Sequence, residues 1–586
     1  MPTPIAMDQP TLEILELLSS TPSLWSDALE TVRADALGIV RRIAPPGGVH
    51  LRRRASLSTY EYLSAAYAAV RDEVKFELTS NLATSSYEWL WYLRRLPREI
   101  FEGELRTTYG YSSLLAEVIA GWAPRTARGA PVVQPDGSLA FAVSRSRLND
   151  VLRLCAWTVL LFDAHAAIRW SSKGVEFQFS DQQPFPEAIP NAGQQRAVRL
   201  YDARMEKEPM SFFGAMTATQ TLDRQRKDAR SALNSDKPFL YAVAPIKHSQ
   251  VSVPIAALPR RQWPRTRAGY APLGLSIERL VDLADAIDLR LLNWPASVPI
   301  LLQLLAMSPL LFALKPGWLA NVLQRGYFVA RWASINELMD SGVFADSLSD
   351  LADELPTLDF AISPPRFWER LQSIDGTDLP LAAGPVVRPA GEDFVAVDLW
   401  TATTRLNHDL QTRESGGHAI NVRSSQFEDA VQEAIDETRW KPTASTLALR
   451  KRLRRGGEDY TDIDAIGEHN SDLLLVSCKF LAYSPEYDAG VYSVIRNAAS
   501  TVLHGIRSLD HLKLHPVGDN YDLTQFRRIY SVVCTPRPIY VPAGPAIETE
   551  IGRLRRSCSL DELRRGLASR PNTHQRSRKQ RRKRRR

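Results

Sequence analysis

Two short stretches in the last third of the chain carry residue types that act on phosphate esters. Asp462 and Asp464 stand in "DID", and Ser477 and Lys479 stand in "SCK". Carboxylates hold Mg²⁺, which prefers oxygen ligands and keeps several of its waters. A bound metal acidifies a water and neutralises phosphate charge, and a nearby lysine adds positive charge to the same oxygens. These residue types therefore predict a site for phosphodiester hydrolysis.

Strand geometry predicts how these residues would meet. Side chains alternate across a strand, so Asp462 and Asp464 should share a face while Ile463 points away. The same alternation places Ser477 and Lys479 on one face. The connecting residues "GEHNSD" are turn formers and predict a hairpin that brings the second aspartate beside the lysine. One patch would then hold one or two carboxylates, a hydroxyl and an ammonium.

The surrounding elements are expected in the order helix, strand region, strand, strand, helix, strand, followed by one more helix. Apolar spacing and turn residues support this order. The expected helices cover 424–438, 490–509 and most of 546–570, and the expected strands cover 446–455, 461–467, 472–480 and 527–534.

This order, with "DID" and then "SCK", resembles the PD-(D/E)xK, or restriction-endonuclease-like, nuclease superfamily over about residues 420–540. The resemblance implies that Asp464 is the principal metal ligand and Lys479 the catalytic lysine. It also implies Glu428, on the first helix, and the main-chain carbonyl of Cys478 as further ligands. The implied cofactor is Mg²⁺ or Mn²⁺.

The sequence departs from the family at Ser477, where the family most often has glutamate. A serine hydroxyl is a weak neutral ligand and brings no charge. Glu428, Glu486, Asp488 or Asp462 could supply the missing carboxylate. If none does, the domain binds nucleic acid without cutting it.

Each site residue also has a purely structural interpretation. Ser425 and Glu428 have the spacing of a capping box, in which the glutamate reaches back to the N-cap amide. Asp464 and Lys479 could form a cross-strand ion pair. Asp462 could be a solvent-facing strand residue, and Ser477 could be a small residue that only fills space in the core.

Basic residues gather just before the acidic stretch and at the C-terminus. The formal net charge is +7, and nine basic residues of the last eleven account for it, which leaves −2 for the rest of the chain. The tail is expected to be disordered and to supply non-specific affinity for nucleic acid. Alternatively, the basic residues before the acidic stretch form a solvated strand edge, and the tail binds polyanions incidentally. The expected phosphate contacts are Arg452, Arg454, Arg455, Arg578, Lys579, Arg581, Arg582 and Lys583.

The first 375 residues contain no motif with an assignable chemistry and are expected to be mainly helical, in one or two subdomains. The densely aromatic "SSYEWLWYLRRL" fits a buried core better than a base-stacking surface, and "LLFDAHAAIRW" fits a structural helix. Leu291–Leu314 is uncharged over a length that could span a bilayer, but three prolines favour two short buried helices. A membrane-associated scaffold built on this segment is the alternative from another class.

The expected fold class is α+β. It divides into a helical region (1–375), a β-hairpin and linker (376–420), a restriction-endonuclease-like domain (421–545), a C-terminal helix (546–570) and a basic tail (571–586). Four scattered cysteines without a CxxC pair favour a cytoplasmic protein without structural zinc. No P-loop is present, so ATP is not expected. The expected function is a nuclease acting on DNA, and the family resemblance suggests defence against foreign DNA as its setting. The sequence leaves open whether the substrate is DNA or RNA and whether the protein forms a homodimer.

Overall fold

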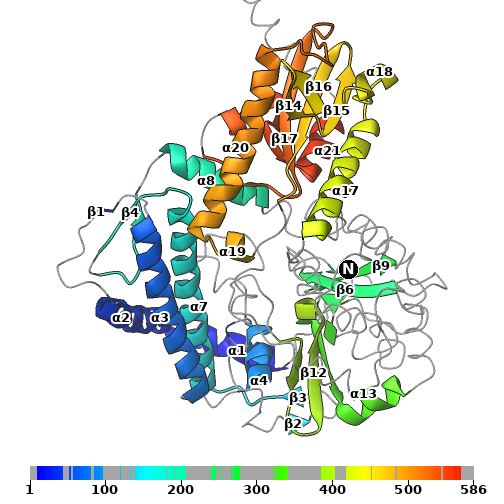
Figure 1. The fold of residues 1–586 in the computed structure, drawn as a ribbon. Helices are drawn as coiled ribbons and strands as arrows, with labels where there is room; N and C mark the ends of the chain where they lie inside the picture. The colour runs from blue at the N-terminus through cyan, green and yellow to red at the C-terminus, as the bar shows by residue number, and fades with distance from the viewer. Residues whose placement is uncertain are drawn as a thin grey trace, which may run out of the picture.

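A computed structural model gives the structure of this protein and describes twenty segments of the chain (Figure 1). Leu291–Leu314 and the basic tail lie outside them. The described residues are 9–43, 52–53, 57–80, 85–96, 119, 132–133, 139–180, 182–189, 192–205, 239–245, 252–253, 266–267, 270–276, 321–322, 325–340, 385–402, 417–450, 452–481, 485–542 and 545–568.

The N-terminal part is rich in helices, as expected. Helices α2, α3 and α7 pack together, and α7 is almost wholly buried. α7 alone among the described helices is long and apolar enough to cross a membrane, and 78% of its apolar window is buried within the protein. The helices are α1 (Gln9–Ser20), α2 (Leu24–Ile43), α3 (Leu57–Ser80), α4 (Ser86–Leu93), α7 (Arg145–Ser171), α8 (Ala192–Met205) and α13 (Trp332–Met339).

The aromatic stretch forms α4 and lies inside the core. Trp89 and Trp91 are both 0% exposed, so they are not available to stack on bases. His165 is buried in α7, and burial lowers its pKa to about 3, which keeps the ring neutral. Both stretches therefore have the structural role that the sequence favours.

Small sheets accompany these helices. The hairpin expected near residue 390 is confirmed, because β11 (Val387–Pro389) pairs antiparallel with β12 (Phe394–Asp398). β12 also pairs with β10 (Tyr327–Arg331), which ties this hairpin to the N-terminal part. The other strands are β1 (Arg52–Arg53), β2 (Val132–Val133), β3 (Leu139–Ala140), β4 (Phe177–Gln178), β5 (Glu187–Ala188), β6 (Phe239–Pro245), β7 (Ser252–Val253), β8 (Thr266–Arg267) and β9 (Tyr270–Ser276).

The C-terminal part contains a four-stranded mixed sheet in the order β15-β16-β17-β20. β15 is antiparallel to β16, whereas β16, β17 and β20 are mutually parallel. A two-residue turn, Asn470–Ser471, joins β15 to β16, and both residues have positive φ, as a tight hairpin requires. The strands are β15 (Ala465–His469), β16 (Asp472–Cys478), β17 (Arg528–Thr535) and β20 (Ser557–Ser559).

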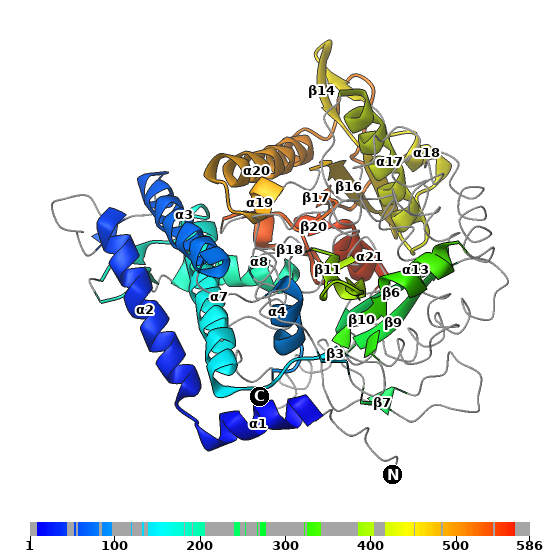
Figure 2. The ribbon, with the colours of Figure 1, turned by 90° about the horizontal axis from the view of Figure 1, so that it is seen from below.

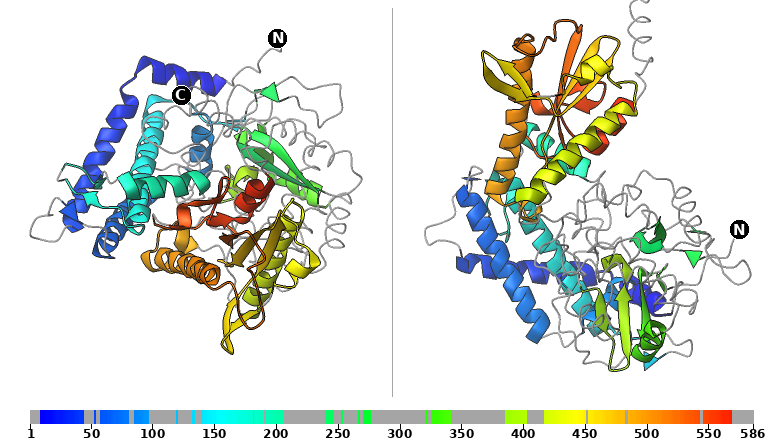
Figure 3. Two further views of the ribbon diagram at one scale, coloured as in Figure 1. Left: turned by 90° about the horizontal axis from the view of Figure 1, so that it is seen from above. Right: turned by 45° about the vertical axis from the view of Figure 1, so that its right-hand side comes forward.

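Helices cover both faces of this sheet. α20 (Tyr492–Leu514) packs on one face through Val502, Ile506 and Leu509. α17 (Gly417–Asp436) and α21 (Leu560–Ala568) pack on the other. Figure 1 and the two views of Figure 3 show the sheet between these helices. The arrangement is a three-layer sandwich that the apolar faces of helix and sheet stabilise.

Two sequence predictions about this part are wrong. The segment 446–455 is expected to be one strand, but it contains the end of a short helix, α18 (Ala444–Leu447), followed by β13 (Arg452–Arg455). Among the described strands, β13 pairs with β14 (Glu458–Asp462) in a separate two-stranded sheet. The helix expected over 546–570 is limited to α21. Before it come a 3-10 turn (Pro545–Ile547), β18 (Thr549–Ile551), β19 (Leu554–Arg555) and β20. β20 satisfies its backbone groups by pairing with β17, which local helical spacing does not reveal.

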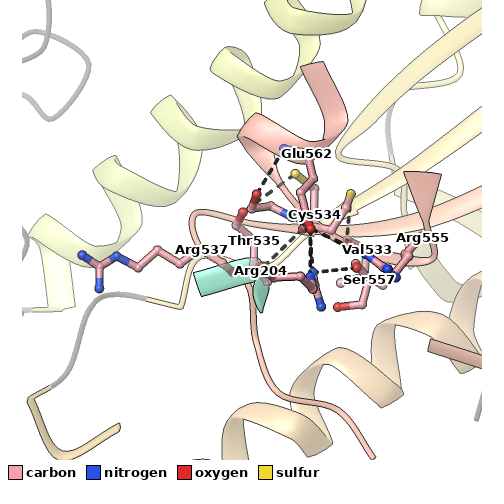
Figure 4. A network of polar contacts seen from close by, with 10 residues as sticks. Arg204, Val533, Cys534, Thr535, Arg537, Arg555, Ser557 and Glu562 are labelled. Carbon is pink, nitrogen blue, oxygen red and sulfur yellow. Dashed lines mark hydrogen bonds and ion pairs between the residues drawn. The ribbon is translucent and has the colours of Figure 1, made fainter. Parts of the chain in front are cut away.

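Helix α8 joins the two parts of the protein, lying between α7 and α21 (Figure 2). Figure 4 shows the Arg204 guanidinium against the Glu562 carboxylate and the Ser557 carbonyl. Arg204 makes two hydrogen bonds to Glu562, at 2.8 and 2.6 Å, and one to the Ser557 oxygen at 3.0 Å. Burial would raise the pKa of Glu562, but the contacts with Arg204 outweigh burial and hold it below its ordinary value.

A buried lysine adds to the same interface. The Lys173 side chain is 1% exposed, and its ammonium lies 3.6 Å from Asp202. It also lies 4.1 Å from the ring centroid of Tyr201 and 5.5 Å from that of Tyr540, within cation–π range. The Tyr540 hydroxyl donates to the Lys173 carbonyl at 2.8 Å. The C-terminal sheet is thus fixed to α7 and α8 by paired charges and aromatic rings.

The substitution Arg204→Ala tests this attachment. It leaves the partly buried Glu562 carboxylate without its main partner, and we expect a loss of about 3 kcal/mol in the free energy of unfolding. Urea unfolding measures this loss. Arg199→Ala, an exposed arginine on the same helix, is the matched control. Equal stability of the two variants would contradict the role given to Arg204.

Candidate active site

Asp464 lies in the two-residue gap between β14 and β15, opposite Ser477 on β16. Its N–H donates to the Val476 carbonyl at 3.2 Å, which continues the hairpin ladder by one residue. Its Oδ2 accepts hydrogen bonds from the Cys478 N–H at 2.6 Å and from the Ser477 hydroxyl at 3.3 Å. The other oxygen, Oδ1, accepts none from the described residues, so it remains available to a ligand.

Lys479 follows β16 directly and lies on the α20 side of the sheet. Its N–H donates to the Cys534 carbonyl at 2.9 Å, which anchors its backbone to β17. A Cβ on Gly505 of α20 would lie 3.5 Å from its Cε and 3.0 Å from Val533. A glycine in the middle of a helix costs about 1 kcal/mol, and here it allows α20 to approach Val533 of β17 closely, with the lysine stem in ordinary contact. No ion pair holds its ammonium among the described residues.

Glu428 approaches the same point from α17. The helix begins at Gly417, so Ser425 lies well inside it and cannot be its N-cap. The capping-box alternative is therefore wrong. The half-buried Glu428 carboxylate accepts no hydrogen bond from the described residues, which leaves its oxygens available.

Electrostatics show that these groups are close enough to influence one another. Burial raises the pKa of Asp464 above its ordinary value, and the Lys479 ammonium opposes part of that rise. Burial also raises the pKa of Glu428, and the Asp464 carboxylate raises it further, while Arg450 and Lys479 oppose the rise. The ionised Asp464 carboxylate disfavours ionisation of Glu428, so a cation bound between them would stabilise both charged groups.

The Cys478 thiol takes no part in this chemistry as a nucleophile. Burial raises its pKa, and the carboxylates of Asp464 and Glu428 raise it further, so the thiol stays protonated. Its contribution is made by the backbone, because its N–H holds Asp464.

Arg450 belongs to the site, although its place in the basic stretch predicted at most a phosphate contact. Its Nε donates to the Asp464 carbonyl at 2.6 Å, and its Nη2 donates to Asp429 on α17 at 2.8 Å. It thereby ties the segment that carries Asp464 to the helix that carries Glu428. Its position at the start of the basic stretch before "DID" was the only sequence indication.

Asp462 does not line the site, although its carboxylate still raises the pKa of Asp464. It ends β14, on a separate hairpin, and pairs with Arg452 at 3.2 Å on an exposed surface. Ile463 is 2% exposed and packs into the core on the α20 side. The prediction that the two aspartates share the face of one strand is wrong, because the chain breaks its strand between them. Asp462 is instead a solvent-facing strand residue, as the structural interpretation of the sequence predicted.

The other two acidic candidates precede α20. Glu486 is exposed on α19 (Pro485–Asp488), and it is not among the charged groups that shift the pKa of Asp464 or Glu428. The Asp488 side chain lies outside the described residues. Of the four candidates for a second carboxylate, Glu428 and Asp462 interact electrostatically with Asp464, and Asp462 is already paired with Arg452.

The arginines of the β13–β14 hairpin are largely neutralised within it. Arg452 pairs with Asp459 at 3.0 Å as well as with Asp462, and Arg454 pairs with Asp459 at 3.2 Å. Together with Arg455 and Glu458, the hairpin contains three arginines and three acids. This is the arrangement expected of a solvated edge. The tail residues expected to bind phosphate lie outside the described residues.

The donor set can be compared with the needs of a metal ion. The described residues contain no group of three or more His, Cys, Asp or Glu side chains that could hold a metal alone. Two carboxylates with open oxygens, from Asp464 and Glu428, still fit Mg²⁺, which commonly takes one or two carboxylates and keeps several waters. They do not fit a zinc site, which takes three or four nitrogen or sulfur ligands.

Comparisons of the chain with family models, with curated proteins and with solved structures find no match. The functional assignment therefore depends on the residues and their geometry.

The substitution Asp464→Asn tests the cost of the buried carboxylate. The pKa of Asp464 is higher in the folded protein than in an unfolded chain, so the ionised group destabilises the fold above that pKa. We expect the variant to be more stable than the wild type near neutral pH. The difference should shrink as the pH falls through the raised pKa, because the wild-type carboxyl is then protonated.

Denaturant unfolding over a pH series measures this difference. Asp462→Asn is the control, since the exposed pair with Arg452 contributes at most about 1 kcal/mol. An Asp464→Asn protein that is less stable than the wild type at neutral pH would argue against an unfavourable buried charge at this position.

Proposed function

We propose that the C-terminal part is a metal-dependent nuclease that hydrolyses phosphodiester bonds, with DNA as the expected substrate. The observation that carries the proposal is that Arg450 hydrogen-bonds both to the Asp464 carbonyl and to Asp429, which holds the helix of Glu428 beside the end of β16 that Lys479 follows. The order of the elements from α17 to β17 adds support, since it resembles the restriction-endonuclease-like superfamily. Defence against foreign DNA is the setting that this resemblance suggests.

Each residue has a defined task in this proposal. Asp464 and Glu428 would hold Mg²⁺ or Mn²⁺ through their open oxygens. When bound, the metal supplies Lewis acidity toward the phosphate and a water of lowered pKa. Lys479 places its ammonium beside the scissile phosphate and stabilises the charge that develops there. The Cys478 N–H and the Ser477 hydroxyl fix the orientation of Asp464.

Ser477 has a different task here from the acid it replaces. Its hydroxyl donates to Asp464, so it orients a ligand and adds no negative charge. The charge of the missing acid would come from Glu428 on α17. Arg450 holds these two segments in place.

A second candidate function follows from the missing acid at Ser477, which adds no negative charge to the site. With only two carboxylates at hand, the domain could bind nucleic acid without cutting it. This alternative predicts nucleic-acid binding that is insensitive to Asp464→Ala and an absence of metal-dependent cleavage. The membrane-scaffold alternative depends on Leu291–Leu314, which lies outside the described residues.

Nicking of a supercoiled plasmid in Mg²⁺ or Mn²⁺ tests the nuclease proposal. We expect Asp464→Ala and Lys479→Ala to lower the rate on the order of 100-fold or more, since each removes a charge that acts on the reacting phosphate. Glu428→Gln should raise the metal concentration needed for half-maximal rate. Ser477→Ala should have a smaller effect, because the Cys478 N–H still holds Asp464.

Asp462→Ala is the matched control, two residues from the proposed ligand and outside the site. It should cut as fast as the wild type. Wild-type rates in the Asp464→Ala and Lys479→Ala proteins would refute the nuclease proposal.

A further inference from the structure

The exposed face of α20 is a continuous polar stripe. Its exposed residues recur every three or four positions along the helix, which places them on one side. The opposite side packs on the sheet through Ala498, Val502 and Ile506. The stripe comprises Ser493, Arg496, Asn497, Ser500, His504, Arg507 and His511, and the exposed Leu514 follows at its C-terminal end.

The stripe carries positive charge and no carboxylate. Arg496 and Arg507 pair with no acid among the described residues, unlike Arg452 and Arg454 of the hairpin. The one acid of the helix, Asp510, lies off the stripe and pairs with Arg556. Serine and asparagine side chains fill the positions between the arginines, and they can donate hydrogen bonds to phosphate oxygens.

The helix on the opposite face of the sheet has the opposite charge. The exposed residues of α17 include Asp429 and Glu433, and Glu437 follows just past its end. Figure 1 shows α17 and α20 on the two sides of the sheet. The exposed stripe of α20 therefore attracts a polyanion more than the exposed side of α17 does, although Asp429 is paired with Arg450 and α21 on the α17 face exposes Arg564 and Arg565.

The stripe is also well placed relative to the candidate active site. Gly505, on the buried side of α20, lies next to the Lys479 stem. An α-helix with its side chains is about 10–12 Å across, so the stripe lies about one helix diameter from the catalytic lysine. Arg496 and Arg507 are about 16 Å apart along the axis, a length over which a duplex presents several phosphates.

We propose that the exposed face of α20 binds the phosphate backbone of the nucleic acid that the adjacent site acts on. Arg496 and Arg507 provide the ionic contacts, and Ser493, Asn497 and Ser500 provide neutral donors. The identity of the ligand rests on the proposed function. The proposal that α20 is a docking surface rests on the charge of the helix. It gives α20 the phosphate contacts that the β13–β14 hairpin, whose arginines are paired with acids, is poorly suited to make.

Two charge-matched double variants of the full chain test the proposal. Arg496→Gln with Arg507→Gln removes the arginines of the stripe, and Arg452→Gln with Arg454→Gln removes two paired arginines of the hairpin. Binding to a short DNA duplex is measured in EDTA over a series of salt concentrations. We expect the α20 variant to reduce the slope of log affinity against log salt by about 1.8, from two lost phosphate contacts, and the hairpin variant to change it less.

A wild-type salt slope in the α20 variant, or a larger loss in the hairpin variant, would overturn the proposal. Competition for the DNA by polyglutamate as effective as unlabelled duplex would also overturn it, since the surface would then suit acidic proteins equally. A photoreactive residue at Ser500 should crosslink to the duplex, while one at Glu433 on α17 should not; the reverse result would place the nucleic acid on the wrong face.

These outcomes are separate from those of the nuclease proposal, because binding in EDTA requires no cleavage. Wild-type nicking by the Asp464→Ala protein would refute the nuclease proposal, but the salt slope would still decide whether α20 binds nucleic acid. Loss of nicking by Asp464→Ala with an unchanged slope in the α20 variant would support the nuclease and reject the docking surface.

Discussion

The register of the β15–β16 hairpin is the constraint on which the candidate site depends. The turn at Asn470–Ser471 fixes Ala465 opposite Val476, and this pairing puts Asp464 opposite Ser477. A slip of one residue would move every side chain of β15 to the other face of the sheet and would separate the carboxylate from the end of β16. The apolar residues of both strands, packed between α17 and α20, make such a slip costly.

That register gives the buried carboxylate of Asp464 only partial compensation. One oxygen receives two hydrogen bonds and the other receives none from the described residues, while Glu428 adds negative charge nearby. A structural ion pair would be arranged to satisfy both partners. The excess of negative charge around open oxygens is the property expected of a cation site, and it comes at the expense of stability.

Charge is distributed over the C-terminal part in a way that suits one ligand orientation. Acids lie on the exposed side of α17, where Asp429 pairs with Arg450. Arg496 and Arg507 of α20 have no acidic partner among the described residues, and the arginines of the β13–β14 hairpin are matched by an equal number of acids. Arg204 and Lys173 instead make the contacts that attach the sheet to α8 and α7. The basic residues of this protein thus divide into those that hold the fold together and those that remain on the surface for a partner.

The sequence by itself determined the local features of the site. Turn formers and alternating apolar residues predicted the hairpin and the pairing of Asp464 with the 477–479 segment, because these patterns act between neighbouring residues in the chain. Only the tertiary structure decided that Asp462 leaves the site, that Glu428 joins it and that Arg450 braces it. It likewise decided that β20 extends the sheet where a helix was expected. Each of these depends on a partner far along the chain, such as β17 for β20 or α17 for Asp464, and local periodicity carries no record of such partners.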